Sequence, residues 1–246
     1  MRIAAISDVH GNPFALRAVM ADIADQSIDL SINLGDLLSG AVSPAETADI
    51  LMDWNIPTIR GNHERQLLED CYEDMSRSDQ AAHGELTDAH RDWLQSLPFS
   101  LEITAGVLAV HATPHDDLTY LLETVTEKGV RPASEEEILA RLDTVTNFDV
   151  ILCGHTHLKR SVTLATGLKI VNPGSVGWPA YDDDKPFPHV MEAGAPEASY
   201  AILDNSTGSW AVEFRAIEYD YEAAANIAKL RDRPEVAYAL MTGTMP

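Results

Sequence analysis

Five short segments of the sequence combine side chains that bind metal ions in proteins. They are Asp8-x-His10, Gly35-Asp36, Gly61-Asn62-His63-Glu64, His111 and Gly154-His155-Thr156-His157. These segments hold five of the nine histidines and no cysteine. Carboxylate oxygen, amide oxygen and imidazole nitrogen together favour Mn²⁺, Fe, Zn²⁺ or Ni²⁺ over a cysteine-rich structural zinc site. The ligands are too many for one ion and about enough for two.

A pair of metal ions is a standard device for in-line attack on phosphorus. Two ions about 3.5–4 Å apart polarise the phosphoryl oxygens, lower the pKa of a water molecule and stabilise the leaving group. The chain has 17 basic and 39 acidic residues and a net charge of -22, so it needs positive charge to hold an anionic substrate. Bound cations would supply that charge.

Apolar runs that read as strands precede the five segments. They cover 3–6, 29–34, 56–60 and 150–153, and a hairpin of 100–104 and 107–110 leads to His111. Helices between the first runs give a β-α-β-α-β-α order, which favours a mostly parallel sheet. Ligand sites in such sheets form at the carboxyl ends of the strands. We therefore expect the five segments to meet at one edge.

The rest of the chain gives further expectations about its elements. We expect helices opened by Pro13 and Pro44, the latter with a capping box of Ser43 and Glu46. Four more helices and four more strands are expected, separated by polar stretches. The helices are expected at 62–74, 87–97, 134–142 and from about 221. The strands are expected at 160–164, 168–171, 200–203 and 210–217. Residues 75–84 are expected to be irregular, and residues 178–198 to form a loop or lid. No linker divides residues 1–246, so we expect one domain.

Composition excludes several classes of protein. A net charge of -22 opposes binding to the nucleic-acid backbone, so we expect no stable nucleic-acid partner. Two cysteines, Cys71 and Cys153, are too few for a disulfide framework. We see no signal peptide and no apolar run of about 20 residues, so we expect a cytoplasmic protein without a membrane partner. Nothing in the sequence indicates the oligomeric state.

Taken together, the five segments resemble the calcineurin-like metallophosphoesterase superfamily. They occur in that family's order between residues 8 and 157, and two later blocks, 172–177 and 199–204, resemble its compact bacterial branch of predicted phosphodiesterases. The resemblance implies an α/β fold, a four-layer α/β/β/α sandwich of two mixed sheets. It also implies two divalent transition-metal ions, with manganese favoured and iron, zinc or nickel as alternatives.

The resemblance also implies a role for each site residue. Asp8, His10 and His157 would hold the first metal ion, Asn62, His111 and His155 the second, and Asp36 both. A metal-activated hydroxide would attack, with His63 as general acid, and Asn62 and His63 would contact the substrate. Arg60 matches an arginine that contacts phosphate in the Ser/Thr-phosphatase branch, whereas Glu64 is interpreted as a helix-start charge.

One departure from the Ser/Thr-phosphatase branch bears on the activity. That branch carries an acidic residue and an arginine shortly after Gly-Asp, where this chain has Ser39 and Gly40. We therefore expect His63 to lack that branch's carboxylate partner, which argues against a protein phosphatase. The preferred hypothesis is a phosphodiesterase that acts on a small ester. The alternatives are a phosphomonoesterase or nucleoside polyphosphate hydrolase, and a catalytically silent scaffold.

Overall fold

The computed structural model describes all residues from Met1 to Pro246. The chain forms thirteen strands and eight α-helices, together with one short 3₁₀ helix. The strands are β1 (Arg2–Ile6), β2 (Leu30–Asn33), β3 (Ser100–Thr104), β4 (Val107–Val110), β5 (Glu123–Thr126), β6 (Gly129–Pro132), β7 (Val150–Leu152), β8 (Arg160–Thr163), β9 (Lys169–Asn172), β10 (Ala180–Asp183), β11 (His189–Glu192), β12 (Ala198–Asp204) and β13 (Ala211–Ile217). The helices are α1 (Pro13–Ala24), α2 (Pro44–Trp54), α3 (Asn62–Glu69), α4 (Arg77–Glu85), α5 (Asp88–Ser96), α6 (Glu135–Leu142), α7 (Tyr221–Leu230) and α8 (Pro234–Thr242), and the 3₁₀ helix is Tyr72–Asp74.

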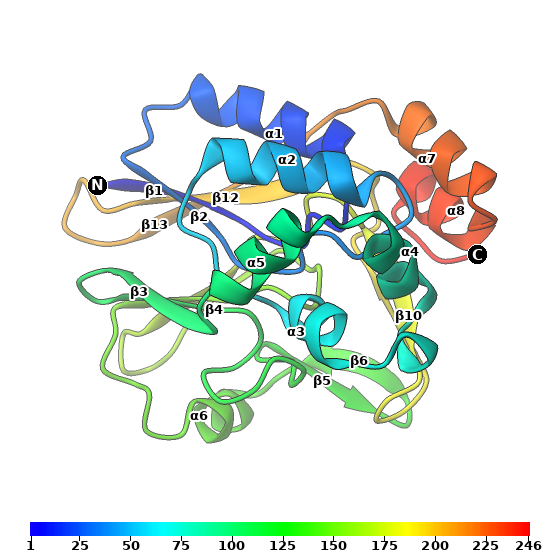
Figure 1. The fold of residues 1–246 in the computed structure, drawn as a ribbon. Helices are drawn as coiled ribbons and strands as arrows, with labels where there is room; N and C mark the ends of the chain where they lie inside the picture. The colour runs from blue at the N-terminus through cyan, green and yellow to red at the C-terminus, as the bar shows by residue number, and fades with distance from the viewer.

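Two mixed sheets form the centre of the molecule. The first has the order β13-β12-β1-β2 and the second β3-β4-β7-β9-β8. β1 runs parallel to β2 and antiparallel to β12, whereas β4, β7 and β9 are parallel to one another. Helices α1 and α2 lie over the first sheet and α6 lies under the second (Figure 1). The expected four-layer α/β/β/α sandwich is confirmed.

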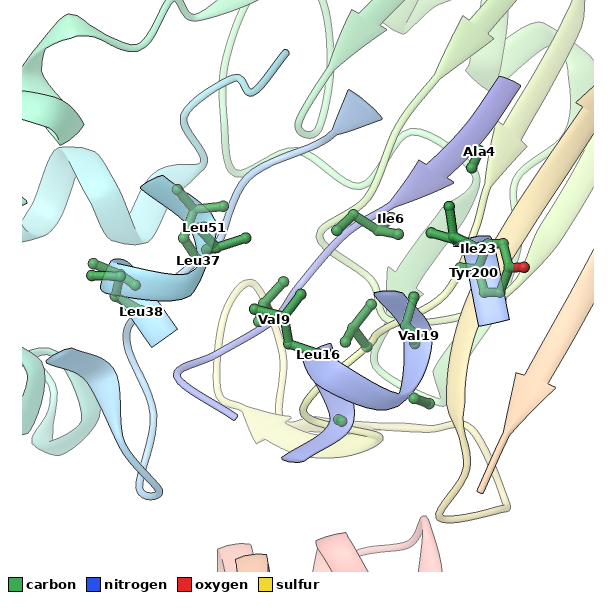
Figure 2. Packing of buried hydrophobic residues seen from close by; sticks show 14 of the residues in the cluster. Ala4, Ile6, Val9, Leu16, Val19, Ile23, Leu37, Leu38, Leu51 and Tyr200 are labelled. Carbon is green, nitrogen blue, oxygen red and sulfur yellow. The ribbon is translucent and has the colours of Figure 1, made fainter. Parts of the chain in front are cut away.

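The central strands β1, β4 and β7 are buried on both faces, which explains their short, uninterrupted apolar runs. In β1 the side chains alternate, so Ile3 and Ala5 point between the two sheets while Ala4 and Ile6 face α1. Figure 2 shows Leu16 and Val19 of α1 packed near Ile6 in the outer layer. The same alternation in β4 and β7 builds the layer between the sheets and the layer against α6.

The parallel strands place the candidate segments at one edge. Asp8 and His10 follow β1, Asp36 follows β2, His111 follows β4, and the 154–157 segment follows β7. The expected strand at 56–60 forms only one parallel bridge, between Thr58 and Asn33. Pro57 lacks a backbone N–H, which limits the pairing of this short run.

Two expectations about helices were wrong. The helix expected at 62–74 ends at Glu69, and most of the stretch expected to be irregular, 75–84, is helix α4. Ser76 caps α4 by accepting a hydrogen bond from the Asp79 N–H at 3.1 Å. The helix has few apolar residues, so its sequence pattern is weak, and packing of small residues such as Ala82 holds it in place.

Two hairpins and one capping interaction also differ from expectation. The loop expected at 178–198 contains the hairpin β10–β11, and the hairpin β5–β6 lies in a region expected to be a loop. β11 packs near β6 and β10 near α8, so tertiary contacts stabilise these polar ribbons. Ser43 precedes α2 but its side chain makes no capping hydrogen bond, and Glu46 pairs with Arg17 of α1 at 2.8 Å. None of the helices is long and apolar enough to cross a membrane.

Candidate metal centre

Two groups of three potential ligands lie at the carboxyl edge of the sheets. The first comprises Asp8, His10 and His157, and the second comprises Asp36, His111 and His155, with the ligand atoms of each group within 4.8 Å of one another. Both groups take ligands from both sheets, because Asp8, His10 and Asp36 follow strands of the first sheet and the others follow strands of the second. The first group contains all three residues assigned to the first ion alone. The second group contains His111 and His155, which were assigned to the second ion, together with Asp36.

Asp36 lies between the two groups. Its Oδ2 atom is 3.2 Å from His111 Nε2 and 3.9 Å from His10 Nε2, whereas its Oδ1 atom accepts the backbone N–H of His63 at 3.1 Å. Asn62 joins the second group, because its Oδ1 is 3.2 Å from His111 Nε2. One carboxylate therefore faces ligands of both groups, which is the position expected of a bridging ligand.

Backbone carbonyls fix the orientation of the imidazoles. The Nδ1 atoms of His10, His111 and His157 lie 2.7, 2.8 and 2.6 Å from the carbonyl oxygens of Ser39, Leu34 and Trp178. A ring that donates from Nδ1 leaves Nε2 as a lone-pair ligand. His155 is reversed, with Nε2 3.0 Å from the carbonyl of Leu118, so its Nδ1 is the free ligand atom.

Five of the candidate ligands adopt the left-handed backbone conformation. Asp8, His10, Asp36, His155 and His157 have φ between 47° and 67° and make up five of the eight non-glycine residues with positive φ. This region is uncommon for residues other than glycine, and such strain gathers at functional sites. The surrounding hydrogen bonds must hold these loops in place.

Close packing requires glycine beside the ligands. A Cβ atom on Gly61 would lie 2.2 Å from Asp36 Oδ1 and 2.8 Å from His111 Cε1. A Cβ atom on Gly154 would lie 2.0 Å from Ser7 Oγ and 3.0 Å from Asp8 Oδ2. The glycines that precede two of the ligand segments therefore make room for the ligands themselves.

Glu64 holds two of the ligand loops together. Its carboxylate is fully buried and accepts the N–H groups of Asp36, Leu37 and Gly61 at 2.8–2.9 Å. The interpretation of Glu64 as a helix-start charge is confirmed, because it caps α3. It also joins the loop after β2 to the start of α3.

The block at 172–177 forms hydrogen bonds to the backbone of the two loops that carry Asp8 and His155. Asn172 donates to the carbonyl of Gly154 at 2.7 Å, and the Ser175 hydroxyl donates to the carbonyl of Asp8 at 2.8 Å. The Gly177 N–H also donates to the Asp8 carbonyl. None of these residues lines the adjacent cavity. Their contribution is to hold the strained loops that carry the ligands.

The electrostatics of the two groups suit cation binding. Burial opposes ionisation of the Asp8 and Asp36 carboxyl groups. The pKa values of both carboxyl groups nevertheless lie below the ordinary range, because His157 is close to Asp8 and His111 is close to Asp36. Burial, followed by a neighbouring imidazole, lowers the pKa of His10 to about 3 and that of His155 to about 4. Two buried carboxylates and two neutral imidazoles are thus present, with His10 and His157 Nε2 atoms only 3.0 Å apart. Burial opposes the charge of His111, but Asp36 raises its pKa to about 9, so an ion bound there would displace the His111 proton. This donor set fits divalent transition-metal ions.

His63 has a carboxylate partner, although not at the position that provides one in the Ser/Thr-phosphatase branch. Its Nδ1 lies 2.7 Å from Asp79 Oδ1, and Asp79 comes from α4 rather than from the position after Gly-Asp. Burial opposes the charge of His63, but Asp36 and then Asp79 raise its pKa to about 10. Sequence reasoning missed Asp79 because it assigned 75–84 to an irregular stretch; the Ser76-to-Asp79 capping spacing was the available signal.

Arg60 is the one assigned residue that lies outside both the ligand groups and the cavity lining. The residues lining the cavity include His10, Asp36, Asn62, His63, His155 and His157 but not Arg60. The Arg60 Nε atom is buried without a hydrogen-bond partner, and its backbone N–H donates to the carbonyl of Pro98. The geometry therefore gives Arg60 no contact with this site.

A cavity of about 930 Å³ opens from the metal-ligand groups, and aromatic side chains form one wall. The Tyr181 hydroxyl donates to the carbonyl of ligand His155 at 3.1 Å and lies 2.8 Å from the Tyr120 hydroxyl. Tyr120 in turn lies 3.0 Å from His189 Nε2. This chain connects the hairpin β10–β11 to a ligand loop.

The sequence and the fold agree on the class of protein. Residues 1–207 match the model of the calcineurin-like phosphoesterase superfamily domain, so the chain belongs to this family of metallophosphoesterases. An uncharacterized protein of Methanocaldococcus jannaschii is 27% identical over 247 residues, which cover 90% of this chain and 89% of that relative.

Two crystal structures share the fold over nearly their whole length. A metallophosphoesterase from Sphaerobacter thermophilus has 23% identity and a TM-score of 0.74, with 99% of both chains covered. A hypothetical protein from Pyrococcus horikoshii has 19% identity and a TM-score of 0.76, covering 100% of this chain and 99% of that one. The expected family and architecture are thereby confirmed.

Proposed function

We propose that this protein is a phosphodiesterase that uses two divalent transition-metal ions, preferably manganese, to hydrolyse a small phosphodiester. The observation that carries the proposal is Asp36, whose Oδ2 faces ligands of both groups while Oδ1 holds the backbone of His63. Asp8, His10 and His157 would hold one ion, and Asn62, His111 and His155 the other. When bound, the ions supply positive charge to the phosphoryl oxygens and lower the pKa of a water molecule.

The chain's own residues provide the proton and the orientation. His63 lines the cavity, with Nδ1 turned to Asp79 and Nε2 left to donate a proton to the departing oxygen. Asn62 lies beside it at the start of α3, lines the same cavity and would contact the same phosphate. Neither role depends on Arg60.

The charge of the cavity favours a diester over a monoester. Its lining includes nine acidic and four basic residues. Three of the basic residues are arginines already engaged within the protein: Arg77 and Arg141 donate to the backbone carbonyls of Asp232 and Glu123, and Arg233 pairs with the Glu235 carboxylate. A diester carries one negative charge and a monoester up to two, so the diester meets less repulsion.

The test is a rate comparison on metal-stripped protein. Mn²⁺, Ni²⁺, Zn²⁺ or Mg²⁺ is added in turn, and matched nitrophenyl mono- and diesters are offered to the wild type, to Asp36→Asn and to Asp53→Asn. Asp53 is an exposed residue of α2 and is the matched control. We expect metal-dependent diester turnover that is lost in Asp36→Asn and kept in Asp53→Asn. Faster monoester turnover would favour the monoesterase, and no turnover with both ions bound would favour a polyphosphate hydrolase or a scaffold.

A further inference from the structure

Asp79 is a buried carboxylate whose oxygens are all engaged by side chains. It is 1% exposed, and its Oδ1 accepts from the Ser39 hydroxyl at 2.6 Å and contacts His63 Nδ1 at 2.7 Å. Its Oδ2 accepts from the Ser76 hydroxyl at 2.6 Å. Burying a carboxylate costs free energy unless it is well paired, so three short contacts from three segments indicate a defined role.

The contact with Asp79 determines how His63 presents its ring. An imidazole that donates from Nδ1 to a carboxylate is held in one plane, and its other nitrogen points away from that carboxylate. His63 lines the cavity, and its side chain is 19% exposed. Asp79 therefore directs Nε2 toward the space where a leaving group would lie.

Ser39 connects this pair to the metal-ligand groups. Its carbonyl accepts from Nδ1 of His10 at 2.7 Å, and its hydroxyl donates to Asp79 at 2.6 Å. Ser39 is fully buried in the loop after β2. Ser39 thus orients the candidate ligand His10 through its backbone carbonyl and orients Asp79, the partner of His63, through its hydroxyl.

We propose that Asp79 is the positioning residue of His63 and that Ser39 sets the place of Asp79 relative to His10. This inference rests on the proposed function, in which His63 donates a proton to the leaving oxygen. A structural alternative is that Asp79 only supports the start of α4, where Ser76 is the N-cap. That alternative predicts lower stability with no effect on the His63 ring.

The first test observes His63 directly and needs no turnover. Protein labelled with ¹⁵N-histidine is loaded with diamagnetic Zn²⁺, and long-range ¹H–¹⁵N spectra are recorded for the wild type, Asp79→Asn, Ser39→Ala and the control Asp53→Asn. We expect a protonated, hydrogen-bonded Nδ1 in the wild type and in Asp53→Asn. The signal should shift strongly in Asp79→Asn and by less in Ser39→Ala. Unchanged His63 signals in Asp79→Asn would overturn the proposal whether or not the enzyme turns over diesters.

The second test uses the leaving group as a probe. With diesters of increasingly poor leaving groups, the rate loss in Asp79→Asn should grow from a few-fold toward ~10²-fold, the lower range of general acid catalysis. In a His63→Gln background the same change should add almost nothing, because the two residues act as a unit. A loss equal for all leaving groups, or one that adds fully to that of His63→Gln, would show a structural role. Absence of wild-type turnover would refute the proposed function while the spectra still decide the placement of His63.

Discussion

Gly61 leaves room for the candidate ligands Asp36 and His111, and a methyl group at this position should impair metal binding. In Gly61→Ala the new Cβ would lie 2.2 Å from Asp36 Oδ1, a distance that forces backbone or ligand to move. We expect loss of at least one bound metal ion and a fall in turnover of more than ~10²-fold, since misplacement of about 1 Å has that effect. Metal analysis and initial rates measure both.

The matched control for this substitution is Gly84→Ala. Gly84 lies in α4, and a Cβ atom there meets nothing within 4 Å. Alanine in a helix interior is better than glycine by about 0.5–1 kcal/mol, so this variant should bind metal normally and melt slightly higher. Full metal content and wild-type rates in Gly61→Ala would contradict our account of the close approach.

His63 should be separable from metal binding. We expect His63→Gln to lower turnover ~10²–10⁴-fold, the range of a general acid, because glutamine cannot release a proton to the leaving oxygen. Both metal ions should remain, since the assigned ligands are intact. Metal analysis of the variant checks the second point. An emptied metal site would mean that His63 is a ligand.

The sequence indicated which candidate ligands lie together because each ligand segment follows an apolar run that reads as a strand. Asp8 and His10 are separated by one residue and lie in one ligand group, whereas His155 and His157, also separated by one residue, lie in different groups. Asp79 is different, because it reaches His63 from 16 residues away through a helix with a weak apolar pattern. The role of Arg60 stays a prediction, since its position in the sequence does not determine where its side chain points and the cavity lining does not include it.

Among the elements, the hairpin β10–β11 depends on two tyrosine hydroxyls. Tyr181→Phe removes the bonds to Tyr120 and to the carbonyl of His155, which are worth about 1 kcal/mol each. We expect faster hydrogen exchange in residues 180–192 while β1 remains protected. Mass spectrometry of exchange measures this, with Tyr238→Phe as control because Tyr238 lies 44% exposed on α8. Unchanged exchange in the hairpin would show that other contacts hold it.

Strands and hairpins differed in how far the sequence could predict them. β1, β4 and β7 are buried on both faces, so continuous apolar runs identify them. β10 contains Tyr181 and two aspartates with two exposed positions, and its stability comes from β11 and α8. Contacts between distant segments leave no periodic signal in a short window, so both small hairpins escaped prediction.

For the whole molecule, metal removal should lower stability. Each ligand group joins the two sheets, so ions that bind the folded chain stabilise it by mass action, by about 2.7 kcal/mol at a free concentration 100 times Kd. We expect a chelator to lower the Tm by several degrees and Mn²⁺ to restore it. Calorimetry checks this, and Asp36→Asn should respond less. An identical Tm with and without metal would show that the bound ions do not stabilise the contact between the two sheets.

The sequence separation within the ligand groups has a consequence for the order of folding. His10 and His157 of the first group are 147 residues apart, and Asp36 of the second group follows a strand of the other sheet from His111 and His155, so neither group exists until both sheets have met. Metal ions therefore have no preformed site in the unfolded chain, and we expect them to bind after the rate-limiting assembly. Interactions absent from the transition state slow unfolding and leave the folding rate nearly unchanged. In stopped-flow experiments Mn²⁺ should lengthen the lifetime of the native state while refolding proceeds at the metal-free rate, and faster refolding would place the centre in the folding nucleus.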